Sequence, residues 1–302
     1  MEQPRVTLVT SSDLPNLSDD FDGILEALRE RKIDPRIAVW DDPDVDWQDA
    51  GLAIILTVTD FAERADEFFE WAESVPKVLN DPRVLRWSSD KHSLIELERR
   101  GMPTITTMWL EPDAGLSKHQ IHTRMPANGD FVVKSSRSSN RHTTGRYTAV
   151  DARSRGAAIE HAGNILKQGN AALVQRYVQS IDQQGEVSLV YLNGLYSHAI
   201  SKEAVLQTEA DPGTRPLSRA YPHQISDAER HLSEDARAAL HAAIRELTGR
   251  DHLLIYTRID IVENEGKLEV LEVNLMDVTL YLSVVDGALE RFADAIAVRA
   301  FW

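Results

Sequence analysis

The sequence contains no cysteine among its 302 residues. This absence excludes disulfides, zinc–thiolate sites, iron–sulfur clusters and thiol nucleophiles. Basic side chains are also scarce, since 33 Lys and Arg stand against 48 Asp and Glu and give a net charge of −15. Passive binding to nucleic acid or to an anionic membrane needs a basic surface. We therefore expect no nucleic acid and no membrane among the partners of this protein.

Long apolar runs are missing as well. No segment approaches the roughly 20 apolar residues that a membrane-spanning helix needs, and the amino-terminal segment lacks the profile of a signal peptide. Together with the absence of cysteine, this predicts a cytoplasmic protein. The share of hydrophobic residues, 42%, is ordinary for a globular chain. The length predicts two or three packed units rather than one core.

The first part of the sequence alternates short apolar runs with segments of helical periodicity. Strands are predicted at 6–10, 36–40 and 52–58, and amphipathic helices at 20–31 and 61–74. Strands that alternate with helices run parallel, with the helices as crossover connections. Residues 1–85 are therefore predicted to form an α/β domain.

The remainder mixes helices and strands less regularly, which favours α+β units. A central unit, 86–178, is predicted from helices at 89–100 and 153–168 and strands at 105–110, 131–134 and 172–178. A C-terminal unit, 179–302, is predicted from strands at 186–192, 195–201, 254–262 and 267–274 and helices at 229–247 and 287–298. Two polar connections, 135–145 and 207–223, are predicted to be mobile lids.

The last two predicted strands form a hairpin with a polar face. Strand alternation places Arg258 and Asp260 on one face of the first strand, and Glu272 and Asn274 on one face of the second. A three-residue loop at 264–266 would set Arg258 opposite Glu272 and leave Asp260 diagonal to Glu272. The intervening residues are then predicted to face the core: Ile259, Ile261, Leu271 and Val273.

Two carboxylates and an amide oxygen on one face suit a hard cation. Asp260, Glu272 and Asn274 are oxygen ligands of the kind that Mg²⁺ prefers. The alternative is a solvated outer face of an antiparallel sheet, where such residues are common. The spacing by itself leaves both interpretations open.

A second candidate cluster is basic. Lys134 ends an apolar strand, and the polar segment after it adds Arg137, Arg141 and Arg146. A lysine at a strand end followed by many hydrogen-bond donors suits a polyphosphate, although the segment lacks the glycines of a P-loop. The alternative is a solvated turn. Lys91 and Lys202 have no distinctive spacing, so by position alone each is a surface lysine.

The strand at 172–178 runs into a polar linker, and a new strand starts at Glu186. A junction of this kind between two units can offer backbone N–H and C=O groups to a flat ring. The alternative is a plain strand that connects two domains.

These pieces, in this order, resemble the ATP-grasp superfamily of carboxylate–amine ligases, and within it the glutathione-synthetase-like ligases. The resemblance covers nearly the whole chain, and its most specific part is Arg-x-Asp followed by Glu-x-Asn in the last hairpin. The nearest likeness is to the cyclo-ligases that act on O-ureido-serine in D-cycloserine biosynthesis. That likeness rests on segments 84–92, 174–186 and 194–202.

The resemblance implies an ATP-grasp architecture, in which an N-terminal pre-ATP-grasp α/β unit precedes two α+β units that clasp ATP. It also implies a role for each candidate residue. Lys91 and Lys134 would hold the ATP phosphates. Adenine would meet the backbone of Arg176, Tyr177 and Val178, with Gln175 or Glu186 at the amino or ribose edge. Lys202 and Arg258 would be the catalytic cations, and Asp260, Glu272 and Asn274 would bind two Mg²⁺ ions.

The implied reaction activates a carboxylate of an amino-acid-like substrate as an acyl phosphate, after which an amine attacks, in the same molecule or in a second one. Three alternatives remain: an intermolecular dipeptide or amide ligase, a catalytically inactive nucleotide-binding regulator, and a kinase-like phosphotransferase. Two segments, 56–61 and 134–140, differ from the cyclo-ligase pattern, so the identity of the substrate is left open. Whether the protein forms a homo-oligomer is left open as well.

Substrate selection is predicted to lie between the first unit and the C-terminal sheet. Ligands of open α/β units bind at the carboxyl ends of the strands. The candidate contacts are Ser11, Ser12, Asp13, Thr57, Thr59 and Arg258.

Overall fold

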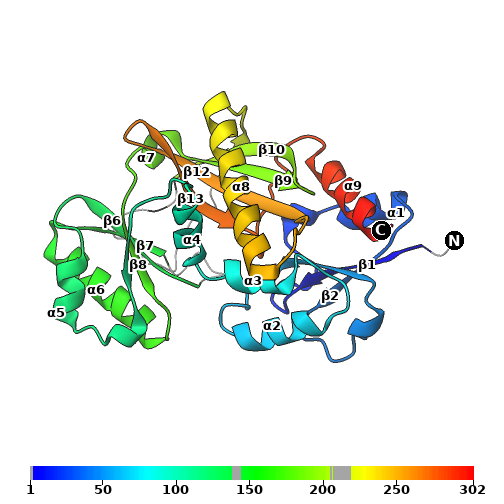
Figure 1. The fold of residues 1–302 in the computed structure, drawn as a ribbon, viewed down its shortest axis with the longest axis horizontal. Coiled ribbons are helices and arrows are strands. Elements are labelled where there is room, and N and C mark those ends of the chain that lie inside the picture. Colours follow the sequence, from blue (N-terminus) through cyan, green and yellow to red (C-terminus); the bar gives the residue numbers. More distant parts are fainter. Residues whose placement is uncertain (1–2, 138–143, 205, 207–218) are drawn as a thin grey trace.

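A computed structural model describes residues 3–137, 144–204, 206 and 219–302. In these ranges the chain builds three sheets, one parallel and two antiparallel, with helices packed on them (Figure 1). Residues 138–143 and 207–218, which belong to the two predicted lids, lie outside the described residues. Within the described ranges, no helix combines the length and the apolar character that a membrane crossing requires.

The first sheet is parallel and confirms the predicted α/β alternation. Its order is β2 (Asp34–Val39), β1 (Arg5–Thr10), β3 (Leu52–Thr57) and β4 (Val78–Leu79). Around it lie η1 (Asp19–Phe21), α1 (Ile24–Glu30), η2 (Trp47–Asp49) and α2 (Ala65–Ser74). β1 and β3 are buried almost throughout, because both faces of the sheet are covered.

The helix predicted at 89–100 is α4, which is shorter (Ser93–Arg99), and it follows a separate helix that was not predicted, α3 (Pro82–Ser88). The break falls at Asp90, whose carboxylate accepts a hydrogen bond from the backbone N–H of His92 at 3.0 Å. This local bond competes with helical pairing and turns the chain. The turn leaves Lys91 free of regular helix, with its backbone N–H bonded to the carbonyl of Ser136 at 2.9 Å.

The second sheet is antiparallel and belongs to the middle of the chain. Its order is β5 (Thr107–Leu110), β8 (Ala172–Arg176), β6 (Asp130–Ser135) and β7 (Thr144–Thr148). The helical segments here are η3 (Pro112–Ala114), α5 (Lys118–Arg124) and α6 (Ala152–Lys167). α5 and α6 pack on one face and bury Phe131, Val133 and Val174 beneath them.

The third sheet is also antiparallel. Its order is β11 (Ala220–Pro222), β10 (Leu195–Lys202), β9 (Glu186–Leu192), β12 (Tyr256–Asn264) and β13 (Lys267–Asn274). The helices of this part are α7 (Ile181–Gln184), α8 (Asp227–Thr248) and α9 (Ala288–Ala300). α8 buries Leu240 and Ile244 against this sheet, while α9 packs beside α1 of the first unit (Figure 1).

The first and third sheets share their hydrophobic core. One buried cluster joins Val9 and Phe68 of the first unit to Leu189 and Ile259 of the third sheet. The middle sheet has a buried cluster of its own, so it stands apart as a separate lobe in Figure 1. A ligand between these two bodies would therefore be held by a rigid pair of sheets on one side and by the middle lobe on the other. The division at residues 85 and 178 stays a proposal.

The predicted register of the last hairpin is wrong. The turn has two residues, Glu265 and Gly266, both with positive φ (51° and 79°), as the tight turns that suit twisted strands require. A bulge then interrupts the pairing between Asp260 and Ile261. Asp260 consequently lies directly opposite Glu272, and Arg258 opposite Asn274. The polar face survives, but its members pair differently.

Candidate active site

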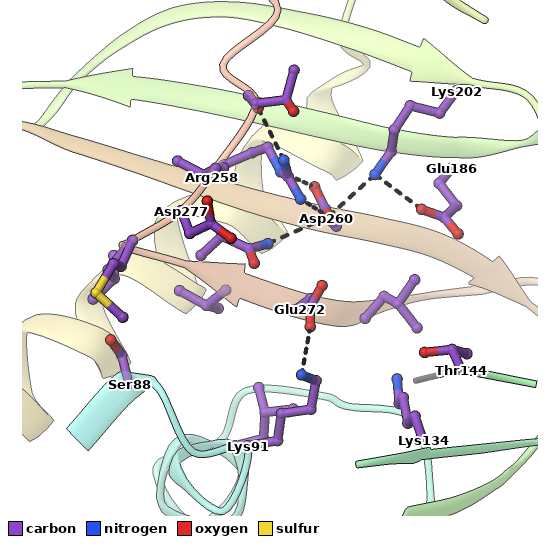
Figure 2. A pocket seen from close by; sticks show the side chains of 18 of the residues that line it. Ser88, Lys91, Lys134, Thr144, Glu186, Lys202, Arg258, Asp260, Glu272 and Asp277 are labelled. Atoms are coloured by element: carbon purple, nitrogen blue, oxygen red, sulfur yellow. Dashed lines mark hydrogen bonds and ion pairs between the residues drawn. The ribbon is translucent and has the colours of Figure 1, made fainter. Parts of the chain in front are cut away.

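A cavity of about 610 Å³ lies where the three units meet. Figure 2 shows charged side chains converging on it from β6, β9, β10, β12, β13 and the α3–α4 turn. All twelve predicted site residues line this one cavity: Lys91, Lys134, Gln175, Arg176, Tyr177, Val178, Glu186, Lys202, Arg258, Asp260, Glu272 and Asn274. The structure thus brings together residues that are up to 183 positions apart, from 91 to 274.

Asp260 is the centre of the ionic network. Its carboxylate, 2% exposed, accepts hydrogen bonds from Nε and Nη2 of Arg258 at 3.0 and 2.9 Å and from the hydroxyl of Ser188. Burial alone would raise the pKa of Asp260, but the positive charges of Arg258 and Lys202 outweigh it and hold that pKa well below its usual range. Asp260 is therefore a permanent anion.

Arg258 is fixed on a second side by backbone. Its Nη1 donates to the carbonyl oxygen of Thr279 at 2.9 Å. Since each terminal nitrogen carries two hydrogens, Nη1 and Nη2 each keep a second N–H beyond the contacts to Asp260 and Thr279. Those two N–H groups are donors in the guanidinium plane that a carboxylate or a phosphate can use.

Lys202 bridges two carboxylates across the cavity. Its Nζ lies 3.0 Å from Oε2 of Glu186 and 3.2 Å from Oδ2 of Asp260. Burial would lower the pKa of Lys202, but the charges of Asp260 and Glu186 raise it above the ordinary lysine value. The ammonium group is thus charged and held in place at one wall of the cavity (Figure 2).

A second pair lies on the facing wall. Nζ of Lys91 is 3.4 Å from Oε1 of Glu272, and buried Lys134 points to the same region (Figure 2). Burial works to raise the pKa of Glu272, but Lys91 and Lys134 lower it below its usual range. Burial lowers the pKa of Lys134, partly offset by Glu272. Cations and carboxylates thus alternate around the cavity.

The donor set fits Mg²⁺. Asp260 and Glu272 are cross-strand neighbours, and on the same face Nδ2 of Asn274 donates to Oδ2 of Asp260 at 3.5 Å. Among the described residues, no three His, Cys, Asp or Glu side chains could hold a metal by themselves. In a site formed by this hairpin, the amide oxygen of Asn274 would be the third ligand beside the two carboxylates. Each carboxylate oxygen has two acceptor positions. In Asp260, Arg258 and Ser188 fill those of Oδ1, and Arg258 and Lys202 those of Oδ2, so a cation bound there would take the place of one of these donors.

The other end of the cavity is less charged. Buried Gln175 donates to the hydroxyl of Thr107 at 2.7 Å, and the side chain of Arg176 turns away to Asn128. The backbone N–H of Tyr177 is bonded to the carbonyl of Asp130 at 2.9 Å. The side chains of Gln175 and Arg176 and the N–H of Tyr177 thus have partners within the protein, and all three residues line the cavity.

Apolar walls complete this end. Ile105, Val132 and Leu271 line the cavity, together with Val273 nearby. The prediction that Ile259, Ile261, Leu271 and Val273 face the core is therefore half right. Ile259 and Ile261 are fully buried, whereas Leu271 and Val273 are partly exposed and line the cavity. Leu271 is the extra, unpaired residue of the bulge, which changes the direction of the side chains along β13.

The predicted substrate contacts divide into two groups. Thr57, Thr59 and Arg258 line the cavity. Ser11 and Asp13 do not; the hydroxyls of Ser11 and Thr59 donate to the carboxylate of Asp13 at 2.6 and 2.5 Å. Ser12 is exposed outside the cavity. The loop after β1 thus holds the loop after β3 in place through hydrogen bonds to Thr59.

Known proteins resemble this chain over nearly its whole length. Residues 6–80 match the family described as D-cycloserine synthetase DcsG, N-terminal domain. The cycloserine biosynthesis protein DcsG of Streptomyces lavendulae is 31% identical over 300 residues, which cover 97% of this chain and 98% of that protein. The chain belongs to the DcsG family.

Solved structures agree with that assignment. The crystal structure of D-cycloserine synthetase DcsG matches with a TM-score of 0.85 and 29% identity, covering 98% of this chain and 99% of that one. An ATP-grasp protein with a RimK domain from Sphaerobacter thermophilus matches with a TM-score of 0.64 and 18% identity, covering 97% and 98%. The second match shows the fold alone. The predicted ATP-grasp architecture is confirmed.

Sequence reasoning missed three parts of this DcsG-family site. Ser188 on β9 bonds to Asp260, Tyr281 lines the cavity, and Thr279 holds Arg258. Ser188 could have been found, because strand alternation from Glu186 places both side chains on the same face. The loop of Thr279 and Tyr281 carries no motif, and nothing in the sequence indicates that it returns to Arg258.

This loop is also held by a histidine whose protonation should affect stability. His198, 3% exposed, donates from Nε2 to the carbonyl of Leu280 at 2.7 Å. Burial lowers the pKa of His198 to about 4. In the unfolded chain the value is about 6.5, so the unfolded state gains a proton first as the pH falls. We expect stability to fall by up to about 3 kcal/mol between pH 6.5 and 4 from this group.

Urea unfolding of the parent and of His198→Gln at pH 7 and pH 4.5 measures that contribution. Glutamine keeps a donor for Leu280 but does not titrate. The variant should therefore lose less stability than the parent over this interval. Equal losses in both proteins would show that His198 does not titrate differently in the two states.

Proposed function

We propose that this protein is an ATP- and Mg²⁺-dependent ligase that activates the carboxylate of an amino-acid-like substrate and then closes a ring within that substrate. The observation that carries the proposal is one cavity, on an ATP-grasp fold, in which the buried network of Arg258, Asp260 and Lys202 faces the ion pair of Lys91 and Glu272. Membership in the DcsG family supports the choice of substrate class.

ATP would lie along the long axis of the cavity. Its adenine would contact the backbone beside Tyr177, between Ile105 and Leu271, and its phosphates would extend towards Lys91 and Lys134. Asp260, Glu272 and Asn274 would hold Mg²⁺, which neutralises phosphate charge and orients the γ-phosphate. The cations around the cavity provide the positive potential that a polyphosphate needs, although the protein as a whole is acidic.

The protein contributes mainly alignment and electrostatics to this chemistry. A carboxylate oxygen of the substrate attacks the γ-phosphorus, ADP leaves, and an acyl phosphate forms; a nitrogen then attacks the acyl carbon and phosphate leaves. The two remaining N–H groups of Arg258 can align the substrate carboxylate for the first step. Lys202, held between Glu186 and Asp260, can stabilise the charge that develops on the transferred phosphoryl group.

Ring closure is the favoured outcome because the DcsG relatives are named for D-cycloserine, a cyclic product. A substrate such as O-ureido-serine carries its carboxylate and an attacking nitrogen in one molecule. Such a substrate needs no second amine, and an intramolecular attack has a high effective concentration.

ADP release by the purified protein tests the proposal. With ATP and Mg²⁺, O-ureido-D-serine alone should produce ADP, phosphate and a cyclic product seen by mass spectrometry. The L enantiomer and pairs of ordinary amino acids serve as comparisons. ADP release only with two added amino acids would indicate an intermolecular ligase, and a phosphorylated product that persists would indicate a kinase. ATP binding without any ADP release would indicate a regulator.

A further inference from the structure

Asp20 belongs to the first unit, yet its carboxylate binds backbone of the C-terminal unit. It is 9% exposed and accepts backbone N–H bonds from Leu280 at 2.6 Å, Tyr281 at 2.9 Å and Leu282 at 2.7 Å. Burial raises the pKa of Asp20 above its usual range, and these N–H groups only partly offset that effect. A buried carboxylate with such partners holds a specific backbone shape.

The shape that Asp20 holds is unusual. Tyr281 has φ = 58°, a left-handed conformation that bulky side chains rarely adopt. Its ring is nevertheless 7% exposed and lines the cavity. Backbone strain at a site is retained only where the surroundings enforce it. The N–H bonds to Asp20 at Leu280, Tyr281 and Leu282 are the enforcing contacts.

The same loop contacts the catalytic arginine twice. The carbonyl of Thr279 accepts from Nη1 of Arg258 at 2.9 Å, and the centre of the Tyr281 ring lies 5.8 Å from the Arg258 guanidinium. Asp20 therefore acts on Arg258 through the loop without touching it. The loop links the first unit, which supplies Thr57 and Thr59 to the cavity wall, to the ionic network on β12.

We propose that Asp20 is a positioning residue for the ligase reaction: it fixes the 279–282 loop so that Arg258 and Tyr281 face the substrate carboxylate. The inference rests on the proposed function of this cavity. Removing Asp20 should then damage turnover rather than ATP affinity, because the adenine end of the cavity lies on β8 and the middle sheet, away from this loop.

Asp20→Asn is the first test, with Asp19→Asn as the matched control. Both oxygens of Asp20 accept N–H groups, so an amide nitrogen would face a donor in either orientation. Asp19 is an exposed neighbour on the same 3-10 helix. We expect kcat of Asp20→Asn to fall by about fivefold or more with the ATP dissociation constant within about twofold of the parent. Asp19→Asn should match the parent.

The variant Tyr281→Gly distinguishes a positioning role of Asp20 from a general disturbance of the fold. Glycine adopts positive φ without strain, so in a Tyr281→Gly background the loop needs Asp20 less. Tyr281→Gly itself should lower turnover, because the ring leaves the cavity wall. The additional loss from Asp20→Asn should shrink to less than about twofold in that background. An undiminished loss would refute the loop as the link.

Amide hydrogen exchange gives a readout that does not depend on activity. In Asp20→Asn, and in Asp20→Glu should the first variant not fold, segment 279–282 should exchange at least about tenfold faster than in Asp19→Asn. If the parent releases no ADP with any substrate, the proposed function fails, while the exchange rates still decide whether Asp20 holds the loop. Unchanged exchange, or unchanged turnover in an active enzyme, overturns the positioning role.

Discussion

Replacing Glu272 with glutamine should lower turnover by about two to three orders of magnitude while leaving the fold intact. Glu272 lies across the hairpin from Asp260 and is ionised, since Lys91 and Lys134 offset its burial and lower its pKa. Glutamine keeps the shape of the side chain but removes one of the two negative charges in the proposed Mg²⁺ site. A site that loses a carboxylate binds a hard cation more weakly.

ATP binding without metal should behave in the opposite way. The Glu272 carboxylate is 31% exposed in the same cavity as the proposed phosphate positions, and Nζ of Lys91 lies 3.4 Å from it. Removing this charge should leave the affinity for metal-free ATP equal or higher, because a repulsive anion is gone. Titration of ATP with and without Mg²⁺ separates the two effects.

Asn274→Asp is the matched contrast to Glu272→Gln. Aspartate keeps an oxygen ligand and adds a charge, so this variant should retain part of the activity with an altered Mg²⁺ dependence. The added carboxylate would stand near Asp260, whose oxygen lies 3.5 Å from the present amide. If both variants turn over like the parent at low Mg²⁺, these residues do not bind the catalytic metal.

Much of the fold could be predicted from hydrophobic periodicity. The strands of the parallel sheet are apolar runs between helical segments, and the Asn193-Gly194 turn between β9 and β10 has a recognisable sequence. Such local patterns locate elements without knowledge of their neighbours. Edge strand β11 and short helix α7 were not predicted, because each is too short to show a period.

The hairpin register shows where local patterns fail. The length of the turn at 264–266, two or three residues, depends on which residues take positive φ. The bulge beside Asp260 depends on how β12 pairs with β9. A bulge moves every later pair by one position. The predicted pair of Arg258 and Glu272 was wrong for this reason.

The candidate site was predictable to different degrees. Asp260, Glu272 and Asn274 followed from strand alternation, but Lys91 and Lys202 had no signal apart from the family resemblance. Neither strand alternation nor the family resemblance indicated a role for Asp20, because its partners are backbone groups 260 to 262 residues away. A contact between a side chain and distant backbone imposes no residue type on the partner, so a single sequence does not reveal it.

Replacing Arg258 with lysine should lower turnover by at least about tenfold, which corresponds to about 1.4 kcal/mol of transition-state stabilisation. Lysine keeps the positive charge beside Asp260. It loses the planar group that now bonds to both oxygens of Asp260 and to the carbonyl of Thr279 while keeping two N–H groups for a ligand. The alignment of the substrate carboxylate should therefore suffer, whereas the charge of the site is unchanged.

The alternative is that Arg258 serves only to neutralise Asp260, since the structure pairs these two residues through a bidentate contact and not Arg258 with Glu272. Charge neutralisation is a task that lysine can perform, so under this alternative Arg258→Lys should release ADP at nearly the parent rate. ATP affinity and steady-state turnover are measured together, with Arg237→Lys on α8 as a control arginine outside the cavity. Turnover that falls with ATP affinity unchanged supports alignment of the carboxylate. An equal loss of ATP affinity and turnover would place Arg258 on the phosphates instead, because only a group that binds ATP in the ground state lowers both.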